Sequence, residues 1–195
     1  MILGLTGGYC AGKNEVATLL EERGWRVADV DKLGHAALAE SRENLAGAFG
    51  PSIVSADGSI DRARLGAIVF SDPAELQKLE SIVHPAMYAL LDRAIESAAE
   101  RGEKRFCINA ALLYRFPQAA ACDAIIEVRA PLYLRLARAA RRDSIAGPEA
   151  IKRIASQRAF WDLRPSGQPL YMLWNTGSPD QLRQRLAGIL SEIEG

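Results

Sequence analysis

Two kinds of hydrophobic pattern alternate along the chain. Short apolar runs, which are typical of buried strands, occur at residues 2–5, 25–30, 105–109, 124–128 and 170–174. Between most of these runs, apolar residues recur at every third or fourth position, as they do on one face of a helix. Strands that alternate with helices predict an α/β fold, with a parallel sheet that carries helices on both of its faces.

Residues 43–101 interrupt this alternation, because they contain helical patterns and no strand pattern. The expected elements are helices at 44–49 and 62–70, a helix start at Asp72-Pro73, and a long helix that begins after His84-Pro85. Proline is well accepted at the first position of a helix, where its missing N–H would have no partner. We therefore predict a single domain of residues 1–195, with a core of residues 1–42 and 102–195 and a helical insert at about 43–101.

The composition argues against two classes of partner. Lysine plus arginine and aspartate plus glutamate number 24 each, so no net charge attracts the chain to nucleic acid or to an anionic membrane. No apolar run approaches the roughly 20 residues that cross a bilayer. The three cysteines lack the spacing of metal ligands, and no basic and apolar leader precedes the first strand. We expect a monomeric protein of the reducing cytoplasm.

The segment GGYCAGKN, residues Gly7 to Asn14, follows the first strand and opens a helix expected at 13–23. It nearly matches the phosphate-binding pattern Gly-x-x-x-x-Gly-Lys-Ser/Thr. The backbone N–H groups of such a loop and the positive end of the helix attract phosphates, and the lysine ammonium binds the outer ones. The nucleotide-binding residues predicted from this segment are Gly7, Gly8, Tyr9, Cys10, Ala11, Gly12, Lys13, Asn14 and Glu15.

Two residues of this loop differ from the usual pattern. Asn14 stands where a hydroxyl normally holds magnesium; its amide oxygen is a hard but neutral ligand, and we predict that Asn14 is the metal ligand. Cys10 occupies a position that is often glycine, so its Cβ would oppose a positive φ. Phosphate binding should survive both changes, whereas the placement of a metal ion is more sensitive to them.

Further motifs follow the loop. They are Asp29-Val30-Asp31, Asp57-Gly58-Ser59-Ile60-Asp61-Arg62, Val69-Phe70-Ser71-Asp72-Pro73, His84-Pro85, Arg138, Arg142-Asp143 and Asn175-Thr176-Gly177. With the loop, their order and spacing resemble the dephospho-coenzyme A kinase family from Gly4 to about Leu182, nearly the whole chain. The resemblance implies a three-layer P-loop NTPase fold with a helical substrate-binding insert and an arginine-rich lid. It also implies that ATP, with Mg²⁺, donates its γ-phosphoryl group to the ribose 3′-hydroxyl of dephospho-coenzyme A.

Four residues are expected on the acceptor side of the site. Asp31 matches the carboxylate that accepts the hydroxyl proton, a role that is compatible with capping the helix that follows. Asp29 is expected to support it, by binding a cation or a water on the metal. His35 matches a position that contacts substrate phosphate or the base, although a lone histidine often only packs. His84 either contacts the substrate or fixes the start of the long helix.

An arginine-rich stretch, LYLRLARAARR at residues 132–142, begins the predicted lid of about 132–164. Arg135, Arg138 and Arg142 recur at intervals of three and four, so they share one helix face. The resemblance assigns Arg138 and Arg142 to the phosphates, where guanidinium groups stabilise the charge of the transition state. For Arg135 and Arg141 we expect a solvated basic face. Beyond the last strand, the resemblance assigns Asn175 and Gly177 to the adenine side of the nucleotide site.

Besides Cys10 and Asn14, four positions depart from the family pattern. The family's Asp-x-Pro-Leu-Leu-Phe-Glu after the third strand is changed at Asn109, Ala111 and Arg115, and Trp174 replaces an aspartate. Asn14, Asn109 and Arg115 leave the site with fewer negative or metal-binding groups. Two alternatives to a working dephospho-coenzyme A kinase therefore stay open. One is an impaired relative that binds nucleotide or coenzyme A in a regulatory role, and the other is a related kinase that phosphorylates another small hydroxyl compound.

Overall fold

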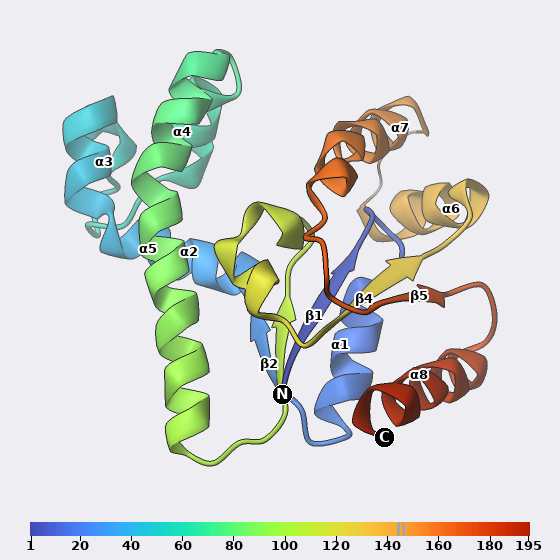
Figure 1. The fold of residues 1–195 in the computed structure, drawn as a ribbon. Helices are drawn as coiled ribbons and strands as arrows, with labels where there is room; N and C mark the ends of the chain where they lie inside the picture. Colours follow the sequence, from blue (N-terminus) through green and yellow to red (C-terminus); the bar gives the residue numbers. More distant parts are fainter. Residues whose placement is uncertain (144, 146) are drawn as a thin grey trace. The chain divides into compact units, whose positions relative to one another are not determined.

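The computed structural model describes residues 1–143, 145 and 147–195, and its centre is a parallel β-sheet surrounded by helices (Figure 1). The strands among these residues are β1 (Ile2–Gly7), β2 (Arg26–Asp29), β3 (Phe106–Asn109), β4 (Ala124–Arg129) and β5 (Leu170–Trp174). They lie in the order β2-β3-β1-β4-β5, and every neighbouring pair is parallel. The predicted α/β fold is confirmed, and the glycine loop follows the central strand.

The helices expected at 13–23, 44–49 and 62–70 are present in the structure with similar bounds. The α-helices are α1 (Lys13–Glu21), α2 (Val30–Glu40), α3 (Arg42–Phe49), α4 (Arg62–Val69), α5 (Pro73–Glu100), α6 (Leu132–Asp143), α7 (Gly147–Ser156) and α8 (Pro179–Glu194). Short 3-10 helices are η1 (Pro51–Ile53), η2 (Leu113–Arg115), η3 (Pro117–Ala121) and η4 (Arg158–Leu163). Within the described part of the chain, no helix is both long and apolar enough to span a membrane.

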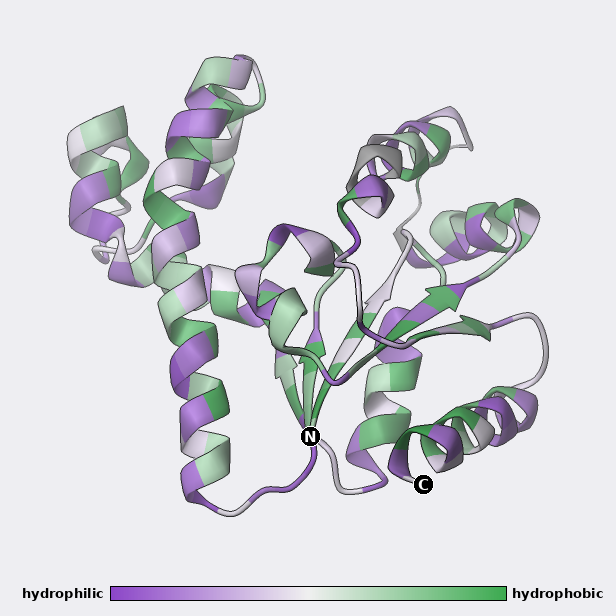
Figure 2. Cartoon of the chain, viewed as in Figure 1, coloured by the Kyte–Doolittle hydropathy of each residue, from purple (hydrophilic) through white to green (hydrophobic). Residues whose placement is uncertain are grey.

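One face of the sheet packs against α1 and α8. Leu3 and Leu5 of β1 are fully buried, and Leu182, Leu186 and Leu190 recur at every fourth position on the covering face of α8. This spacing places the three leucines along one side of the helix. Figure 2 shows the same distribution, with hydrophobic residues along the central strands and both kinds of residue on the surrounding helices.

Helix α8 begins with a capped first turn. The Ser178 side chain accepts a hydrogen bond from the Gln181 backbone N–H, and the Gln181 side chain accepts one from the Ser178 backbone N–H. This reciprocal arrangement is a capping box, which satisfies two N–H groups that the helix itself leaves without acceptors. Ser178 is therefore the N-cap of α8.

The opposite face of the sheet is covered by the segment that contains η2 and η3. A Cβ added to Gly4 of β1 would lie 2.7 Å from Leu113 Cδ2 and 3.1 Å from Cys122 Sγ. Glycine inside a strand often marks such a close approach. The lack of a side chain at Gly4 thus lets residues after β3 pack directly on the centre of the sheet.

The chain forms two compact units, and each is described by itself. The first, Met1–Asp29 with Ala98–Gly195, contains the sheet. The second, Val30–Ser97, has its own apolar core, in which Ala37, Leu45 and Leu65 are buried. Within this unit, the Asp61 side chain accepts hydrogen bonds from two N–H groups in the first turn of α4, as an N-cap does.

The helix expected to start after His84-Pro85 is part of a longer one. Helix α5 runs without interruption from Pro73 to Glu100, and Pro85 lies inside it. An internal proline removes one backbone hydrogen bond and costs about 3 kcal/mol. The cost is offset because Val83, Ala86 and Leu90 pack into the core of the second unit on one face of α5. The prediction that a helix starts after His84-Pro85 was wrong, and His84 therefore does not fix the start of a helix.

Candidate active site

The loop between β1 and α1 has the backbone shape of an anion-binding turn. Gly12, directly before α1, has φ 98°, in the left-handed region that glycine adopts without strain. A Cβ at this position would also collide with the side-chain amide of Asn175. The loop lies at the carboxyl end of the central strand and at the N-terminus of α1, where the helix dipole favours a negative ligand.

Cys10 has φ 59°, as expected from its place in the loop. A left-handed conformation costs an L-residue about 1–2 kcal/mol. The Cys10 side chain is buried and packs in a small apolar cluster with Ala139 of α6 and Ala150 of α7. Packing against the lid helices thus compensates in part for the strained backbone, which explains how this loop accepts a side chain where glycine is usual.

The Lys13 side chain is almost fully buried, with 8% of its surface exposed. Its ammonium nitrogen donates a hydrogen bond to Asn14 Oδ1 at 3.1 Å and another to Asn109 Oδ1. Asn14 belongs to the loop, whereas Asn109 ends β3. Two of the positions that depart from the family pattern therefore act on the same cationic group.

Arg138 of α6 holds the loop to the segment that follows β5. Its guanidinium group donates hydrogen bonds to the backbone oxygens of Cys10 (3.4 Å) and Ala11 (3.1 Å). It also donates to the backbone oxygen and to Oδ1 of Asn175, at 3.1 and 3.2 Å. Asn175 Nδ2 completes the contact by donating to Ala11 O and Glu15 Oε2, both at 3.2 Å. The structure thus brings together five of the predicted site residues, which are Cys10, Ala11, Glu15, Arg138 and Asn175.

A lysine cannot reproduce the contacts of Arg138, because an ammonium group lacks the planar fork of a guanidinium. We expect Arg138→Lys to raise the KM for ATP about tenfold, which corresponds to losing about one hydrogen bond made by a charged group. Steady-state kinetics at varied ATP concentration measure this value. Arg141→Lys, at an exposed position of the same helix, is the matched control and should leave the KM unchanged. Equal effects of the two substitutions would contradict the prediction.

The sequence pattern predicts that Arg135 lies on a solvated basic face, and this prediction is wrong. Its Nε donates a hydrogen bond to the backbone oxygen of Tyr9 at 2.7 Å, and the side chain is half-buried. A Cβ on Gly8 would lie 2.6 Å from Arg135 Nη2, so the absence of a side chain at Gly8 makes room for the guanidinium group. Burial lowers the pKa of Arg135. Arg141, by contrast, is exposed as expected.

Tyr9 contacts the lid on several sides. Its backbone N–H donates to Gln157 Oε1 at 2.7 Å. The guanidinium carbons of Arg142 and Arg153 lie 5.5 and 5.7 Å from the centre of its ring, within the range of cation–π attraction. The sequence analysis missed Gln157 and Arg153, although an aromatic residue in a phosphate loop beside an arginine-rich lid suggests such contacts. Ser144 and Ala146 of the predicted lid lie outside the described residues.

Glu127 forms a buried hydrogen-bonded cluster that the sequence patterns do not predict. It is a fully buried carboxylate on β4, and it accepts hydrogen bonds from Tyr114 Oη (2.6 Å), Arg164 Nε (2.6 Å) and Arg129 Nη2 (2.8 Å). Burial raises the pKa of Glu127, but hydrogen bonds from these three residues outweigh it and hold the pKa below its usual value. Burial and the neighbouring carboxylate raise the pKa of Tyr114, so the phenol keeps its proton. The cluster ties Arg164, at the end of the lid, to the sheet.

A cavity of about 610 Å³ lies beside the loop. Its lining includes Gly8, Ala11, Arg135, Trp161, Arg164 and Trp174. Its volume falls within the range of about 300–1,000 Å³ that is common for ligand pockets. Trp174, the residue that replaces an aspartate of the family pattern, is 45% exposed. The loop is therefore bordered by an aromatic and basic hollow, all of it within the first unit.

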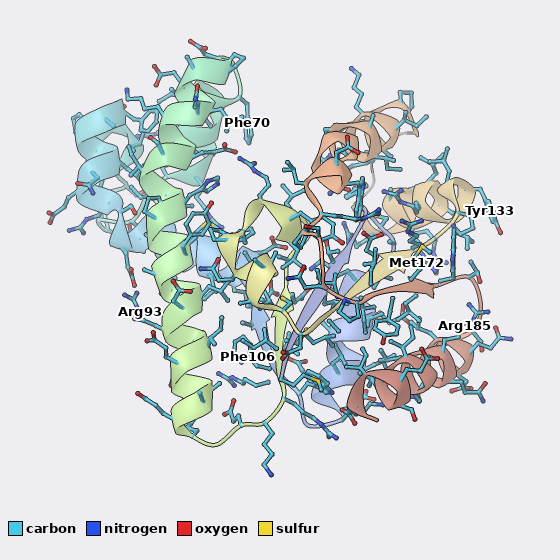
Figure 3. All side chains as sticks on the ribbon, viewed as in Figure 1. Phe70, Arg93, Phe106, Tyr133, Met172 and Arg185 are labelled. Atoms are coloured by element: carbon cyan, nitrogen blue, oxygen red, sulfur yellow. The ribbon has the colours of Figure 1, made fainter. Side chains whose placement is uncertain are left out.

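A side chain of α8 holds the segment between β5 and α8 in place. Arg185 (Figure 3) donates from Nη1 to the backbone oxygen of Trp174 at 2.6 Å and to Thr176 Oγ1 at 3.0 Å. Gly177 lies against the Gln181 side chain of the capping box, where a Cβ would collide with Oε1. Asn175 contacts the loop directly, whereas the described contacts of Gly177 support the turn into α8.

The acceptor-side residues belong to the second unit. Asp31 lies in the first turn of α2, two residues after Asp29 at the end of β2. Arg62 Nη1 and His35 Nε2 are 2.9 Å apart, which is within hydrogen-bonding distance. His84 lies inside α5, with its ring 5.8 Å from that of Tyr88. The roles of Asp31, His35 and His84 stay predictions.

Comparison with known proteins identifies the family. The family model described as dephospho-CoA kinase matches residues 1–162. A dephospho-CoA kinase of Anaeromyxobacter dehalogenans is 33% identical over 100% of this chain and 92% of its own length, and one of Deinococcus radiodurans is 36% identical over 98% and 92%. A crystal structure from Thermus thermophilus superposes with TM-score 0.81 at 32% identity, covering 100% of this chain and 98% of that one. Dephospho-CoA kinase from Campylobacter jejuni, at 22% identity and TM-score 0.74 over 98% and 96%, shares the fold. The chain belongs to the dephospho-CoA kinase family.

Proposed function

We propose that the protein is an ATP-dependent kinase that transfers the γ-phosphoryl group to the ribose 3′-hydroxyl of dephospho-coenzyme A. The observation that carries this proposal is the position of Lys13, whose ammonium group lies at the phosphate loop and donates hydrogen bonds to Asn14 Oδ1 and Asn109 Oδ1. The family supports the choice of substrates, because its members named above are dephospho-CoA kinases. We further propose that the protein acts as a monomer in the cytoplasm, without nucleic acid or membrane partners.

Each group of site residues has a separate proposed role. Loop residues Gly7 to Glu15 form the phosphate site at the N-terminus of α1, and Lys13 binds the outer phosphates as a full charge. Arg138 and Arg142 stabilise negative charge that develops on the transferred group. Asn175 and Gly177 border the adenine. On the acceptor side, Asp31 accepts the proton of the attacking hydroxyl, and His35 and His84 contact dephospho-coenzyme A.

The residues present fit a magnesium ion that arrives with ATP. Within the described residues, no group of three or more His, Cys, Asp or Glu could hold a metal ion. Asn14 Oδ1 lies 3.1 Å from the Lys13 ammonium, next to the expected phosphates, and supplies a hard neutral oxygen. Phosphate oxygens, water and Asn14 would then hold Mg²⁺. When bound, Mg²⁺ neutralises phosphate charge and helps to orient the nucleotide.

The proposal is tested by incubating purified protein with ATP, dephospho-coenzyme A and Mg²⁺ or Mn²⁺ and measuring coenzyme A by mass spectrometry. We expect product that requires both substrates and that is lost in Lys13→Met. A panel of other hydroxyl acceptors, including adenosine and pantetheine, should raise ATP turnover far less. Binding of ATP without turnover on any acceptor would refute the proposal in favour of a regulatory nucleotide binder, and a preference for another acceptor would replace the substrate.

Asp31→Asn should lower kcat about 100-fold while the KM for ATP changes little. General-base catalysis contributes roughly 10²–10⁴-fold, and the amide keeps the shape of the side chain while it loses the ability to accept the proton. Steady-state kinetics with both substrates measure the effect. Asp72→Asn, at an exposed helix start in the same unit, is the control. A kcat near that of the unmodified protein would exclude Asp31 as the base.

A further inference from the structure

The cavity beside the loop is lined by basic and apolar side chains, and by no acidic one among the residues that the structure describes. Its charged lining residues are Arg129, Arg135 and Arg164. Aliphatic side chains and two indole rings, those of Trp161 and Trp174, form much of the remaining wall. Apolar walls with a few convergent charged groups are typical of a small-molecule site. The lining therefore suits an anion that carries an apolar body.

Two of the three guanidinium groups are oriented by the buried carboxylate of Glu127. Arg164 donates from Nε (2.6 Å) and Nη2 (2.9 Å) to the two Glu127 oxygens, and Arg129 donates from Nε (3.2 Å) and Nη2 (2.8 Å) to one of them. A guanidinium group has five N–H donors in one plane, and these pairs use only its Nε edge. Both arginine side chains are 36% exposed, so their other edges can still bind a ligand.

The third guanidinium group is oriented by the loop. Arg135 Nε donates to the backbone oxygen of Tyr9, and its Nη2 lies where a Cβ on Gly8 would be 2.6 Å away. The three arginines and Glu127 together carry two net positive charges. A phosphate monoester carries about −1.5 to −2 at pH 7, so it balances this excess better than a singly charged carboxylate does.

The cavity is not explained by the two substrates of the proposed reaction. Lys13, at the expected outer phosphates, is not among its lining residues, and neither are Arg138 and Asn175. Of the phosphate loop, only Gly8 and Ala11 border it. The cavity also lies beside β4 and β5, whereas the acceptor side is expected after β2, on the opposite side of β1 in the sheet.

We propose that this cavity is a second ligand site, which binds a phosphate monoester with a planar ring, of the nucleoside monophosphate class. The phosphate contacts the guanidinium groups of Arg129, Arg135 and Arg164, and the ring packs against Trp161 or Trp174. Glu127 supports the site because it holds two of the three arginines in place. The site does not depend on the proposed kinase reaction.

Intrinsic fluorescence can measure binding, because Trp161 and Trp174 line the cavity, whereas Trp25, the third tryptophan, is buried in the core. AMP is titrated into protein that is saturated with the non-hydrolysable analogue β,γ-imido-ATP and Mg²⁺, so that the phosphate loop is occupied. We expect saturable quenching by AMP. Adenosine, which lacks the phosphate, and inorganic phosphate, which lacks the ring, should each bind at least about tenfold more weakly.

Two substitutions act on the cavity by different means. Arg164→Gln removes one guanidinium charge, and Ala155→Phe, at an exposed residue of α7 that lines the cavity, fills part of its volume. Each should weaken AMP binding about tenfold, the first through lost charged hydrogen bonds and the second through a clash. Both variants should bind β,γ-imido-ATP within about twofold of the unmodified protein. Arg141→Gln, at an exposed position of α6 outside the cavity, is the control for AMP binding.

Four outcomes would overturn the inference. They are no quenching at millimolar AMP, quenching that disappears when β,γ-imido-ATP is present, equal affinity for AMP and adenosine, and unchanged AMP affinity in Ala155→Phe. The second outcome would show that AMP binds at the phosphate loop. Should Arg164→Gln not fold, as judged by thermal unfolding, Ala155→Phe decides, because it keeps all three arginines and their contacts with Glu127 and the loop.

Discussion

Replacing Lys13 by methionine should lower kcat/KM for ATP about a thousandfold. Methionine keeps the apolar stem in a site where the lysine is almost fully buried, so the change removes the charge and the hydrogen bonds to Asn14 and Asn109. Loss of a single group that stabilises developing charge costs roughly 10²–10³-fold, and loss of a full positive charge at a transferred phosphoryl group reaches the upper end. Steady-state coenzyme A production at varied ATP concentration measures the ratio.

Lys152→Met is the matched control, because Lys152 is exposed on α7 of the same unit. It should leave kcat/KM within about twofold of the unmodified protein, as surface substitutions usually do. The two variants should also unfold at similar temperatures, which separates a lost function from a lost fold. If Lys13→Met kept most of its activity, the loop would not bind the phosphates through this residue.

The sheet and the loop could be predicted because both depend on local sequence. Alternation of strand and helix patterns is a property of neighbouring residues, and so is the spacing from Gly7 to Asn14. The same reasoning failed at Pro85, where a local rule predicted a helix start. There, burial of one face of α5 in the core of the second unit outweighs the lost hydrogen bond.

The partners of the site side chains were harder to predict, because tertiary packing chooses them. Arg135 lies on a helix face with Arg138, and periodicity alone does not show which arginine reaches the loop; the answer depends on the room that Gly8 leaves. Lys13 and Asn109 are 96 residues apart, and only the pairing of β1 with β3 brings them together. The family resemblance supplied roles for Asp31 and Arg142, which the pattern of residues does not supply by itself.

Glu127→Gln should destabilise the protein by about 3 kcal/mol. Breaking a buried ion pair by removing one partner typically costs about 3–5 kcal/mol. The lower value is expected here, because the Arg129 and Arg164 side chains are each 36% exposed and keep part of their hydration after the carboxylate is lost. For a chain of this length, the midpoint of thermal unfolding should fall by about 6–12 °C. Differential scanning calorimetry at neutral pH measures the shift.

The same substitution should lose its effect in acid. Because the pKa of Glu127 is lowered in the folded protein, its contribution to stability is present above the unfolded pKa of about 4.3 and is lost as the pH falls through the folded value. The gap between the unfolding temperatures of the unmodified protein and Glu127→Gln should therefore narrow below about pH 4. Glu149→Gln is the control: Glu149 is also paired with an arginine, but its side chain is 56% exposed, so its loss should cost at most about 1 kcal/mol. A gap that stays constant with pH, or equal costs for the two substitutions, would show that Glu127 stabilises the fold by its packing and not by its charge.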